Sequence, residues 1–279
     1  MKGGQTMATN TVYNNKVIEA KAKDLLTTAV NARSMMTVDN SLVSSAGMIK
    51  TINTYTYTGK AEELGVGVGN TAGDRGSIAY VGKDYTVKLV QQACDYFDED
   101  YMKDNLIVDY MLKGATQVMT NKMTSDFYDA LATKGSDNQT ELVKGITFAK
   151  GKELSYDVIV DAISELNVED ESGIFIVIPN KWKAGLRHDP DYKSAQLGQV
   201  IYNGQVGTVS GIPVIATKAL TDKAYVMTKE AVTLFLKKDV EVEQDRDADK
   251  RKNSIYLRNC YICALTDATK ACKITEAKA

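Results

Sequence analysis

Few residues in this 279-residue chain have side chains arranged for catalysis. The single histidine, His188, lies in the polar stretch LRHDPDY beside Asp189 and Asp191. One histidine excludes a two-histidine metal site or a histidine relay within one chain. No nucleophile lies beside a base in a recognisable motif, so these three residues are the strongest remaining candidate for an active site. We expect a surface turn here and no enzyme activity, with an enzyme that uses this region as an alternative.

Cysteines and glycines form two further patterns. Cys260 and Cys263 are a C-x-x-C pair, but Cys94 and Cys272 supply no second pair, so core thiols are expected in place of zinc ligands. The run Gly65–Gly69 is followed by more loop residues, whereas a phosphate loop needs a strand before it and a helix after it. The sequence therefore predicts no metal site and no cofactor.

The composition is that of an ordinary globular protein, with 44% hydrophobic and 25% charged residues. The formal net charge of −2 gives no concentrated positive surface for gripping phosphate backbones. No apolar run approaches the ~20 residues that a membrane-spanning helix needs. The first ten residues, MKGGQTMATN, lack the apolar core of a signal peptide. We expect a cytoplasm-like compartment and no membrane.

The longest predicted element is a helix over Phe97–Ala132. Asp98, Glu99 and Asp100 occupy its first turn, where carboxylates favour the positive end of the helix dipole. Its apolar residues recur at gaps of three and four and form one stripe. The stripe comprises Tyr101, Leu106, Ile107, Tyr110, Met111, Ala115, Val118, Met119, Met123, Phe127 and Leu131. A helix of roughly 50 Å tends to bridge parts of a subunit.

Two alternating stretches precede this helix, MIKTINTYTYTGK and YVGKDYTVKLVQQ. They predict a pair of long antiparallel strands over Thr51–Leu89, joined by a tip rich in glycine and charge. A two-stranded ribbon has little core of its own, so it should project and lie on another surface. Its tyrosines Tyr55, Tyr57, Tyr80 and Tyr85 are large and amphipathic, which suits an interface.

The flanking segments predict an arm and a compact α/β domain. Asn14–Met36 is weakly amphipathic and suggests an arm that packs on something else or, equally, a peripheral helix of the same subunit. Leu154–Asn167 predicts a helix with Ser155 at its N-cap. Gly173–Asn180 is continuously apolar and predicts a strand buried on both faces, and a second buried strand is expected around Ile212–Ala216.

The C-terminal part consists of strand-like stretches around a highly charged one. Val232–Glu243 alternates as a strand does, and Gln244–Asn253 is a dense run of mixed charge that predicts a solvated loop. Ser254–Leu265 is apolar again, and Ala271–Thr275 predicts a short last strand.

This order of parts resembles the major capsid protein of tailed bacteriophages with the Hong Kong 97-type fold. The motif GQVGTVSGIPVIAT carries a Gly-Ile-Pro-Val-Ile pattern common in that family's axial domain. The resemblance implies an α+β fold with an N-terminal arm, an extended β-hairpin loop, a spine helix in a peripheral domain, and an α/β axial domain. The implied divisions are 1–50 for the arm, 51–92 for the extended loop, 93–151 with 229–265 for the peripheral domain, and 152–228 with 266–279 for the axial domain.

The resemblance also implies a function. Copies would assemble as pentamers and hexamers into the icosahedral head, a virion capsid built in the host bacterial cytoplasm around a double-stranded DNA genome. A separate scaffolding protein, a portal and decoration proteins are the implied partners. An encapsulin-like shell around protein cargo is the alternative with the same fold. The expected inter-subunit contacts are Tyr55, Tyr57, Lys60, Glu62, Glu63, Asp74, Arg75, Tyr80, Tyr85, Asp245, Arg246 and Asp247.

Some members of the family crosslink their subunits through a Lys–Asn isopeptide bond that a glutamate promotes. Lys60 and Lys83 are amines on the predicted ribbon, but the corresponding strand, Leu257–Leu265, contains no Glu or Asp. We therefore expect no covalent crosslinking.

Overall fold

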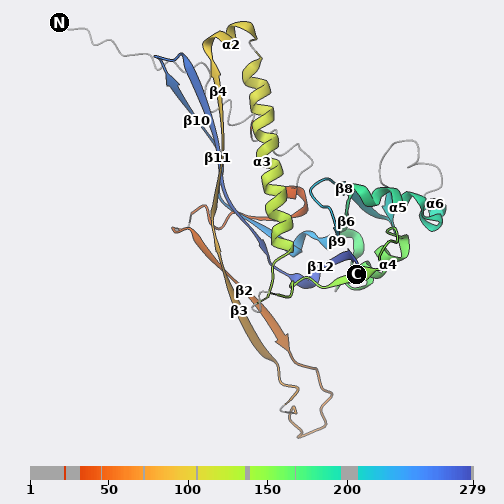
Figure 1. The fold of residues 1–279 in the computed structure, drawn as a ribbon. Helices are drawn as coiled ribbons and strands as arrows, with labels where there is room; N and C mark the ends of the chain where they lie inside the picture. The colour runs from red at the N-terminus through yellow and green to blue at the C-terminus, as the bar shows by residue number, and fades with distance from the viewer. Residues whose placement is uncertain are drawn as a thin grey trace.

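The computed structural model describes residues 22, 32–44, 46–71, 73–104, 106–135, 139–166, 168–195 and 207–277. The subunit is elongated (Figure 1). A long sheet with a helix along it extends to one end, a two-stranded ribbon projects from the other, and an α/β domain lies to one side. The predicted arm helix over Asn14–Met36 falls largely outside the described residues. Its last part is a 3₁₀ turn, η1 (Ala32–Met35).

The long sheet has four strands in the order β1-β10-β11-β4. They are β1 (Thr37–Asp39), β10 (Val232–Asp247), β11 (Lys252–Leu265) and β4 (Lys88–Phe97). β1 runs parallel to β10, and the other pairs are antiparallel. A loop was expected over Gln244–Asn253, but β10 extends to Asp247 and β11 begins at Lys252, so the turn is shorter than predicted. Cross-strand pairing continues to Asp247↔Lys252, because charged side chains in these outer pairs are satisfied by ion pairs across the sheet.

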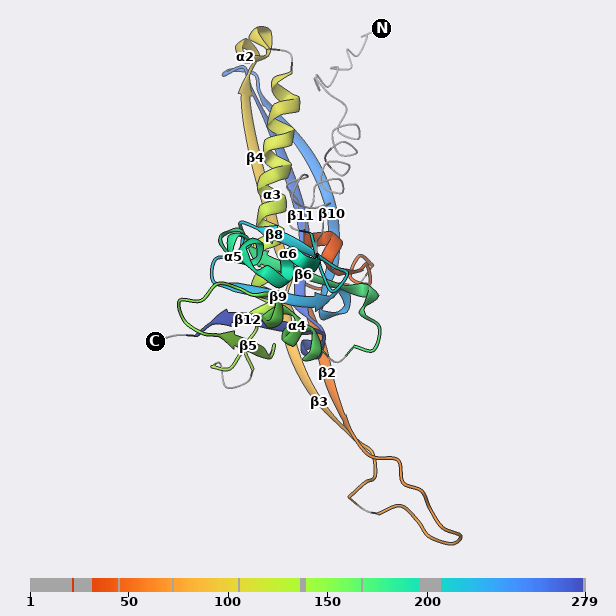
Figure 2. The ribbon, with the colours of Figure 1, turned by 90° about the vertical axis from the view of Figure 1, so that its right-hand side faces the viewer.

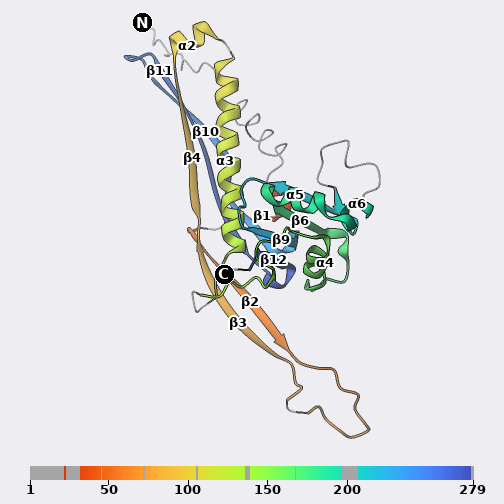
Figure 3. The same ribbon diagram turned by 45° about the vertical axis from the view of Figure 1, so that its right-hand side comes forward.

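The long helix is interrupted. Phe97–Ala132 was expected to be one helix, but it forms α2 (Asp98–Lys103) and α3 (Ile107–Leu131). Asp104 has extended backbone angles (φ −144°, ψ 111°), and its Oδ1 accepts a hydrogen bond from the Leu106 N–H at 2.8 Å. This local side-chain bond competes with helical pairing. α3 then runs along β11 and β4 for ~37 Å (Figures 1 and 3).

The ribbon consists of β2 (Ile49–Thr58) and β3 (Ser77–Thr86), paired antiparallel from Ile49↔Thr86 to Thr58↔Ser77. The second strand was expected to continue from residue 80 through residue 92. Instead the chain leaves the ribbon at Val87 and enters the four-stranded sheet as β4. Val87 is buried, and its N–H donates to the Met48 carbonyl at 2.7 Å. Burial of this one side chain fixes the point at which the chain changes sheets.

The α/β domain contains a six-stranded sheet in the order β5-β12-β9-β6-β8-β7. The strands are β5 (Gly145–Phe148), β12 (Ala271–Glu276), β9 (Lys223–Thr228), β6 (Ile174–Pro179), β8 (Ile212–Thr217) and β7 (Thr208–Val209). β6 is fully buried, as its apolar run predicted. β8 is formed as expected but is not buried along its length: Pro213 is exposed and Ile215–Thr217 are half-buried, since on the side away from β6 only the two-residue strand β7 covers it.

Three α-helices accompany this sheet: α4 (Tyr156–Ser164), α5 (Lys183–His188) and α6 (Pro190–Ala195). Short 3₁₀ turns complete the elements: η2 (Glu171–Gly173), η3 (Asn180–Trp182), η4 (Lys229–Ala231) and η5 (Ala268–Lys270). Ser155 occupies the N-cap of α4 but makes no side-chain capping bond. Asp189 Oδ2 accepts from the Tyr156 N–H at 2.7 Å instead, so a distant residue satisfies this helix end.

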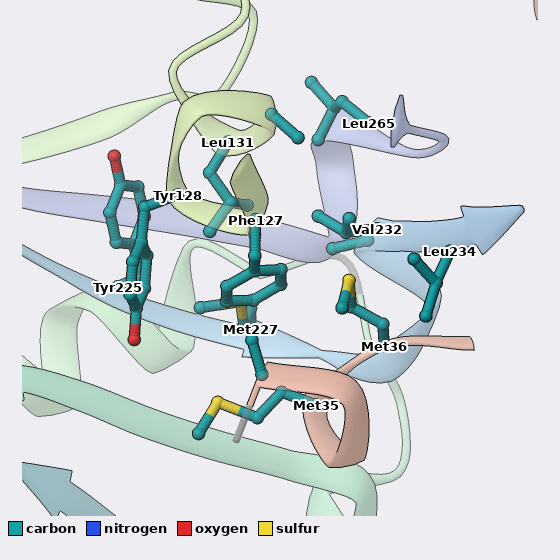
Figure 4. Close-up of a cluster of buried hydrophobic side chains, with 14 of the residues drawn as sticks. Met35, Met36, Phe127, Tyr128, Leu131, Tyr225, Met227, Val232, Leu234 and Leu265 are labelled. Atoms are coloured by element: carbon teal, nitrogen blue, oxygen red, sulfur yellow. The ribbon is translucent and has the colours of Figure 1, made fainter. Parts of the chain in front are cut away.

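One apolar cluster joins the two sheets to the helix (Figure 4). Phe127 and Leu131 from the end of α3 pack against Met227 of β9 and Leu234 of β10, and all four are fully buried. The Tyr128 and Tyr225 rings stack beside them, with centroids 6.3 Å apart and an interplanar angle of 18°. Separate clusters lie beneath α4 to α6 and along the upper part of α3. The central cluster makes the α/β domain and the long sheet one packed body.

The pairings place three segments on different sides of the expected divisions. β1 joins the long sheet and not an arm, and β4 from Lys88 onward is also part of that sheet. β5 pairs with β12, so residues 145–148 belong with the α/β domain and not with the long sheet. These shifts arise because parallel and antiparallel pairing joins segments whose local sequence does not reveal their partner.

Candidate assembly surfaces

The ribbon is anchored to the body by a small apolar cluster at its root. Ile52 of β2 and Val87 are buried against Phe235, Ile262 and Ala264 of the long sheet. The Lys50 ammonium lies 5.3 Å from the Phe235 ring centroid. These contacts hold only the first residues of the ribbon, which leaves its outer part free to meet another surface.

A buried carboxylate lies beside this root. Asp126 of α3 has a side chain only 2% exposed. Its Oδ1 accepts hydrogen bonds from Lys88 Nζ at 2.7 Å and Lys122 Nζ at 3.0 Å, and its Oδ2 accepts from the Tyr261 hydroxyl at 2.9 Å. Burial opposes ionisation, but these three hydrogen bonds outweigh it and lower the pKa of Asp126. Asp126 therefore joins three elements: α3, β4 at the ribbon root, and β11.

Two further contacts tie the ribbon root to the end of α3. Lys83 Nζ donates to the Lys134 carbonyl at 3.4 Å. Tyr85, an expected contact residue, is half-buried; burial raises its pKa, and a hydrogen bond with the Thr133 side chain partly offsets the rise. Tyr85 therefore contributes to the root of the ribbon inside its own subunit.

The other expected tyrosines lie on the outer part of the ribbon. The backbones of Tyr55 and Tyr80 are directly paired, and Tyr57 pairs with Ile78. The Ile78 side chain is exposed, although it lies on a paired strand. Figures 1 and 2 show that this part of the ribbon extends away from the body in both views.

The ribbon tip, residues 59–76, holds five expected contact residues. Glu62 Oε2 accepts from the Thr71 N–H at 2.8 Å, which lowers the pKa of Glu62, while the neighbouring Glu62 carboxylate raises the pKa of Asp74. The Lys60 N–H donates to the Asp74 carbonyl at 3.1 Å. Glu63 and Arg75 are exposed, like the Lys60 side chain. The tip thus has a shape of its own and presents both signs of charge.

The same tip exposes apolar side chains. Val66 is fully exposed, and Leu64 and Val68 are also exposed. Sequence reasoning treated this stretch as soft and charged and missed these three residues, although their alternation with glycine was visible. Exposed apolar groups at a projecting tip are the usual mark of a contact surface.

The remaining expected residues, on the β10–β11 hairpin, are mostly engaged inside the subunit. Arg246 Nη2 lies 2.8 Å from Asp98 Oδ2 at the start of α2. Asp247 Oδ1 accepts from the N–H groups of Asp249 and Lys250 and closes the turn; the Lys250 N–H is the main cause of its lowered pKa. Asp245 is exposed. The Arg246–Asp98 ion pair therefore ties this hairpin to the start of α2.

A second exposed apolar surface lies at the break between α2 and α3. Phe97, Met102, Leu106 and Tyr110 are all exposed, as is Val118 further along α3. Leu106, Tyr110 and Val118 were expected to be on the buried stripe. The first half of α3 instead buries Val108 and Leu112, which the predicted stripe did not include, together with Ala115, which it did.

The candidate enzyme residues have structural roles. His188 is exposed at the end of α5, with Nδ1 3.2 Å from Glu153 Oε2. Asp189 caps α4 and also accepts from the Asp191 N–H at 2.9 Å. Cys260 and Cys263 pack into different clusters. Within the described ranges, no three His, Cys, Asp or Glu side chains converge closely enough to hold a metal ion. None of the described helices is both long and apolar enough to cross a bilayer.

The arrangement of ribbon, spine helix, long hairpin and α/β domain is the Hong Kong 97-type capsid fold, as the sequence indicated. Solved structures share it. The chain resembles the capsid of cyanophage P-SCSP1u with a TM-score of 0.64 and 12% identity, over 88% of this chain and 87% of that one. Mycobacterium phage Che8 gives a TM-score of 0.58 and 16% identity, over 85% of this chain and 88% of that one. A virus-like particle from Pyrococcus furiosus gives a TM-score of 0.61 and 10% identity, over 93% of this chain and 98% of that one.

A sequence comparison points the same way. The chain is 33% identical over 121 residues to the major capsid protein of Staphylococcus phage phiMR11. This match covers 41% of the chain and 44% of the relative, so it spans less than half of either protein. No family model matches the sequence.

Proposed function

We propose that this chain is the major capsid protein of a tailed bacteriophage. Copies assemble as pentamers and hexamers into an icosahedral head that encloses double-stranded DNA. The observation that carries this proposal is the ribbon: it has the fold position of a capsid extended loop and exposes Leu64, Val66 and Val68 at a tip beyond its own subunit. The sequence likeness to a phage major capsid protein supports the same conclusion.

The charge of the chain fits a container. A net charge of −2 allows the shell to enclose dense nucleic acid without gripping it, because tight phosphate binding requires a basic face. Contacts between copies must be heterologous, since a projecting ribbon meets a different surface on its neighbour, and such contacts close into rings. A separate scaffolding protein, a portal and decoration proteins are the further partners that we infer. The role is structural and not enzymatic, and its location is the virion, with assembly in the host cytoplasm.

A shell around protein cargo is the second candidate. The virus-like particle from Pyrococcus furiosus shares the fold over 93% of this chain and 98% of that one, so a shared fold alone does not decide between the two functions. The contents of purified shells distinguish the two: double-stranded DNA supports the phage head, and a packaged protein supports the alternative.

The tip of the ribbon offers a direct test. Residues 59–76 are replaced by Asn-Gly, which closes Thr58 and Ser77 with a two-residue hairpin turn. The variant is expected to remain folded, because the tip packs on nothing else that the structure describes, but to lose closed shells in negative-stain electron microscopy. Normal shells from the variant, or a small oligomer of the wild type even with its partner genes present, would contradict the proposal.

A control variant distinguishes the length of the ribbon tip from the apolar side chain that the tip exposes. Val66→Ser keeps the tip and its glycines but removes the most exposed apolar side chain. We expect it to weaken shell formation less than the tip replacement, while circular dichroism and the unfolding midpoint stay unchanged for both variants.

A further inference from the structure

The ribbon is long and contacts the body at its root, so a small rotation at the root displaces its far end. From Val87 to Ser77 it extends ~33 Å, so a rotation of about 10° at the root moves the far end of β3 by ~6 Å. In the described residues, polar contacts between ribbon and body are confined to the root. The residues that hold this root therefore determine where the tip arrives.

Asp126 is placed to do this. Lys88, which binds Asp126 Oδ1 at 2.7 Å, comes directly after Val87, where the chain passes from the ribbon to the long sheet. Lys88 is also paired in register with Tyr261, whose hydroxyl binds the other oxygen of the same carboxylate at 2.9 Å. One buried carboxylate thus connects the ribbon root to both α3 and β11.

We propose that Asp126 is a positioning residue for assembly: its bond to Lys88 fixes the direction in which the ribbon leaves the subunit. The link to assembly rests on the capsid function proposed above. The Asp126 side chain is buried in its own subunit and acts through Lys88 and the root.

Lys122 supplies a matched control. Its ammonium binds the same oxygen, Asp126 Oδ1, at 3.0 Å, and its side chain is as exposed as that of Lys88 (49% against 53%). Lys122 lies on the same helix as Asp126, so it has no connection to the ribbon. Lys88→Met and Lys122→Met remove equal charge from one carboxylate, and only the first releases the ribbon root. Lys88→Arg restores a donor at that position.

Hydrogen–deuterium exchange measured by mass spectrometry tests the positioning role on the full-length chain. In Lys88→Met, the amides over Thr86–Leu89 should exchange roughly three- to tenfold faster, as expected for the loss of one hydrogen bond from an ammonium that is half-exposed and therefore screened by solvent. Lys122→Met should exchange like the wild type there, and Lys88→Arg should restore most of the protection. The global unfolding midpoint should be equal in both Met variants. Equal exchange at the root in the two Met variants would overturn the proposal.

Electron microscopy of the assembled particles tests the consequence. Lys88→Met should give a broader distribution of shell diameters or open shells, and Lys122→Met should give wild-type shells. Faster exchange in Lys88→Met with a wild-type diameter distribution would refute the link to assembly. If the wild type forms no shells at all, the capsid function fails, but the exchange measurement still decides whether Asp126 holds the ribbon.

Discussion

Replacing Tyr261 with phenylalanine removes one hydroxyl from the centre of the subunit. That hydroxyl donates to Asp126 Oδ2 at 2.9 Å, and the tyrosine is 1% exposed. A hydrogen bond to a charged group contributes about 1.5–3 kcal/mol, and the phenyl ring preserves the packing. We therefore expect Tyr261→Phe to lower the free energy of unfolding by about 2 kcal/mol. For a chain of this size, the melting temperature should fall by about 4–8 °C.

The assay is urea unfolding of the unassembled subunit at pH 7, followed by circular dichroism. Tyr256→Phe is the control, because Tyr256 lies on the same strand, is half-buried, and uses its hydroxyl in no hydrogen bond among the described residues. It should change the stability by less than about 0.5 kcal/mol. Equal effects from the two variants would refute the assignment of stabilising energy to the Asp126 contact.

The same contact predicts a pH dependence. The folded pKa of Asp126 is lowered, so its contribution to stability is fully present above the unfolded pKa, near 3.9, and is lost as the pH falls through the folded pKa. The difference between wild type and Tyr261→Phe should therefore be constant from pH 5 to 7 and should shrink only in stronger acid. A difference that shrinks between pH 7 and 6 would show that another group is responsible.

Four further substitutions test individual positions. Val66→Asp should leave the unfolding midpoint unchanged but abolish shells in electron microscopy, because the side chain is fully exposed at the ribbon tip. Gly185→Ala should cost about 1–3 kcal/mol in urea unfolding, since the added Cβ would lie 2.7 Å from Glu153 Cβ, whereas Gly114→Ala, with open space around it, should stabilise α3 by about 0.5–1 kcal/mol. Phe127→Ala should cost about 3–5 kcal/mol, because this ring is fully buried in the cluster that joins the two sheets.

Local patterns predicted the elements whose burial is uniform. The apolar run at β6 is buried along its whole length because strands cover it on both edges and apolar clusters lie on both faces. The second half of α3 buries the predicted residues from Ala115 to Leu131 except Val118, since the helix is regular there and packs against the sheets. In both cases one physical cause, a continuous buried surface, acts on every turn or residue.

Breaks and partners were less predictable. At the interruption, the Asp104 side chain accepts a hydrogen bond from the Leu106 N–H. The periodicity of apolar residues carries no information about such a bond. The switch of sheets at Val87 depends on the burial of one valine against the long sheet, although the alternation of side chains continues unbroken through it. The pairing of β5 with β12 joins residues more than a hundred positions apart, and no local signal names that partner.

The candidate contact residues show the same division. Lys60, Glu63 and Arg75 are exposed at the tip, as a projecting loop requires. Arg246 looked equally available in the sequence but pairs with Asp98, 148 positions away. In the exposed apolar group at Phe97, Met102, Leu106 and Tyr110, the last two were assigned to the buried helical stripe, so the group was not recognised. Charge and apolarity predict which side chains need a contact partner, but only the fold shows whether that partner lies in the same subunit.

The central cluster explains how a subunit with such long projections remains one body. Phe127 and Leu131 pack on strands of both sheets at the point where α3 ends, close to the ribbon root. Force applied to the ribbon therefore meets first the few polar contacts at its root, among them those of Asp126, and only then the apolar cluster, which cannot be deformed without creating voids. The direction of the ribbon thus depends on a few contacts at the root, whereas the relation between the two sheets is held by a continuous apolar cluster.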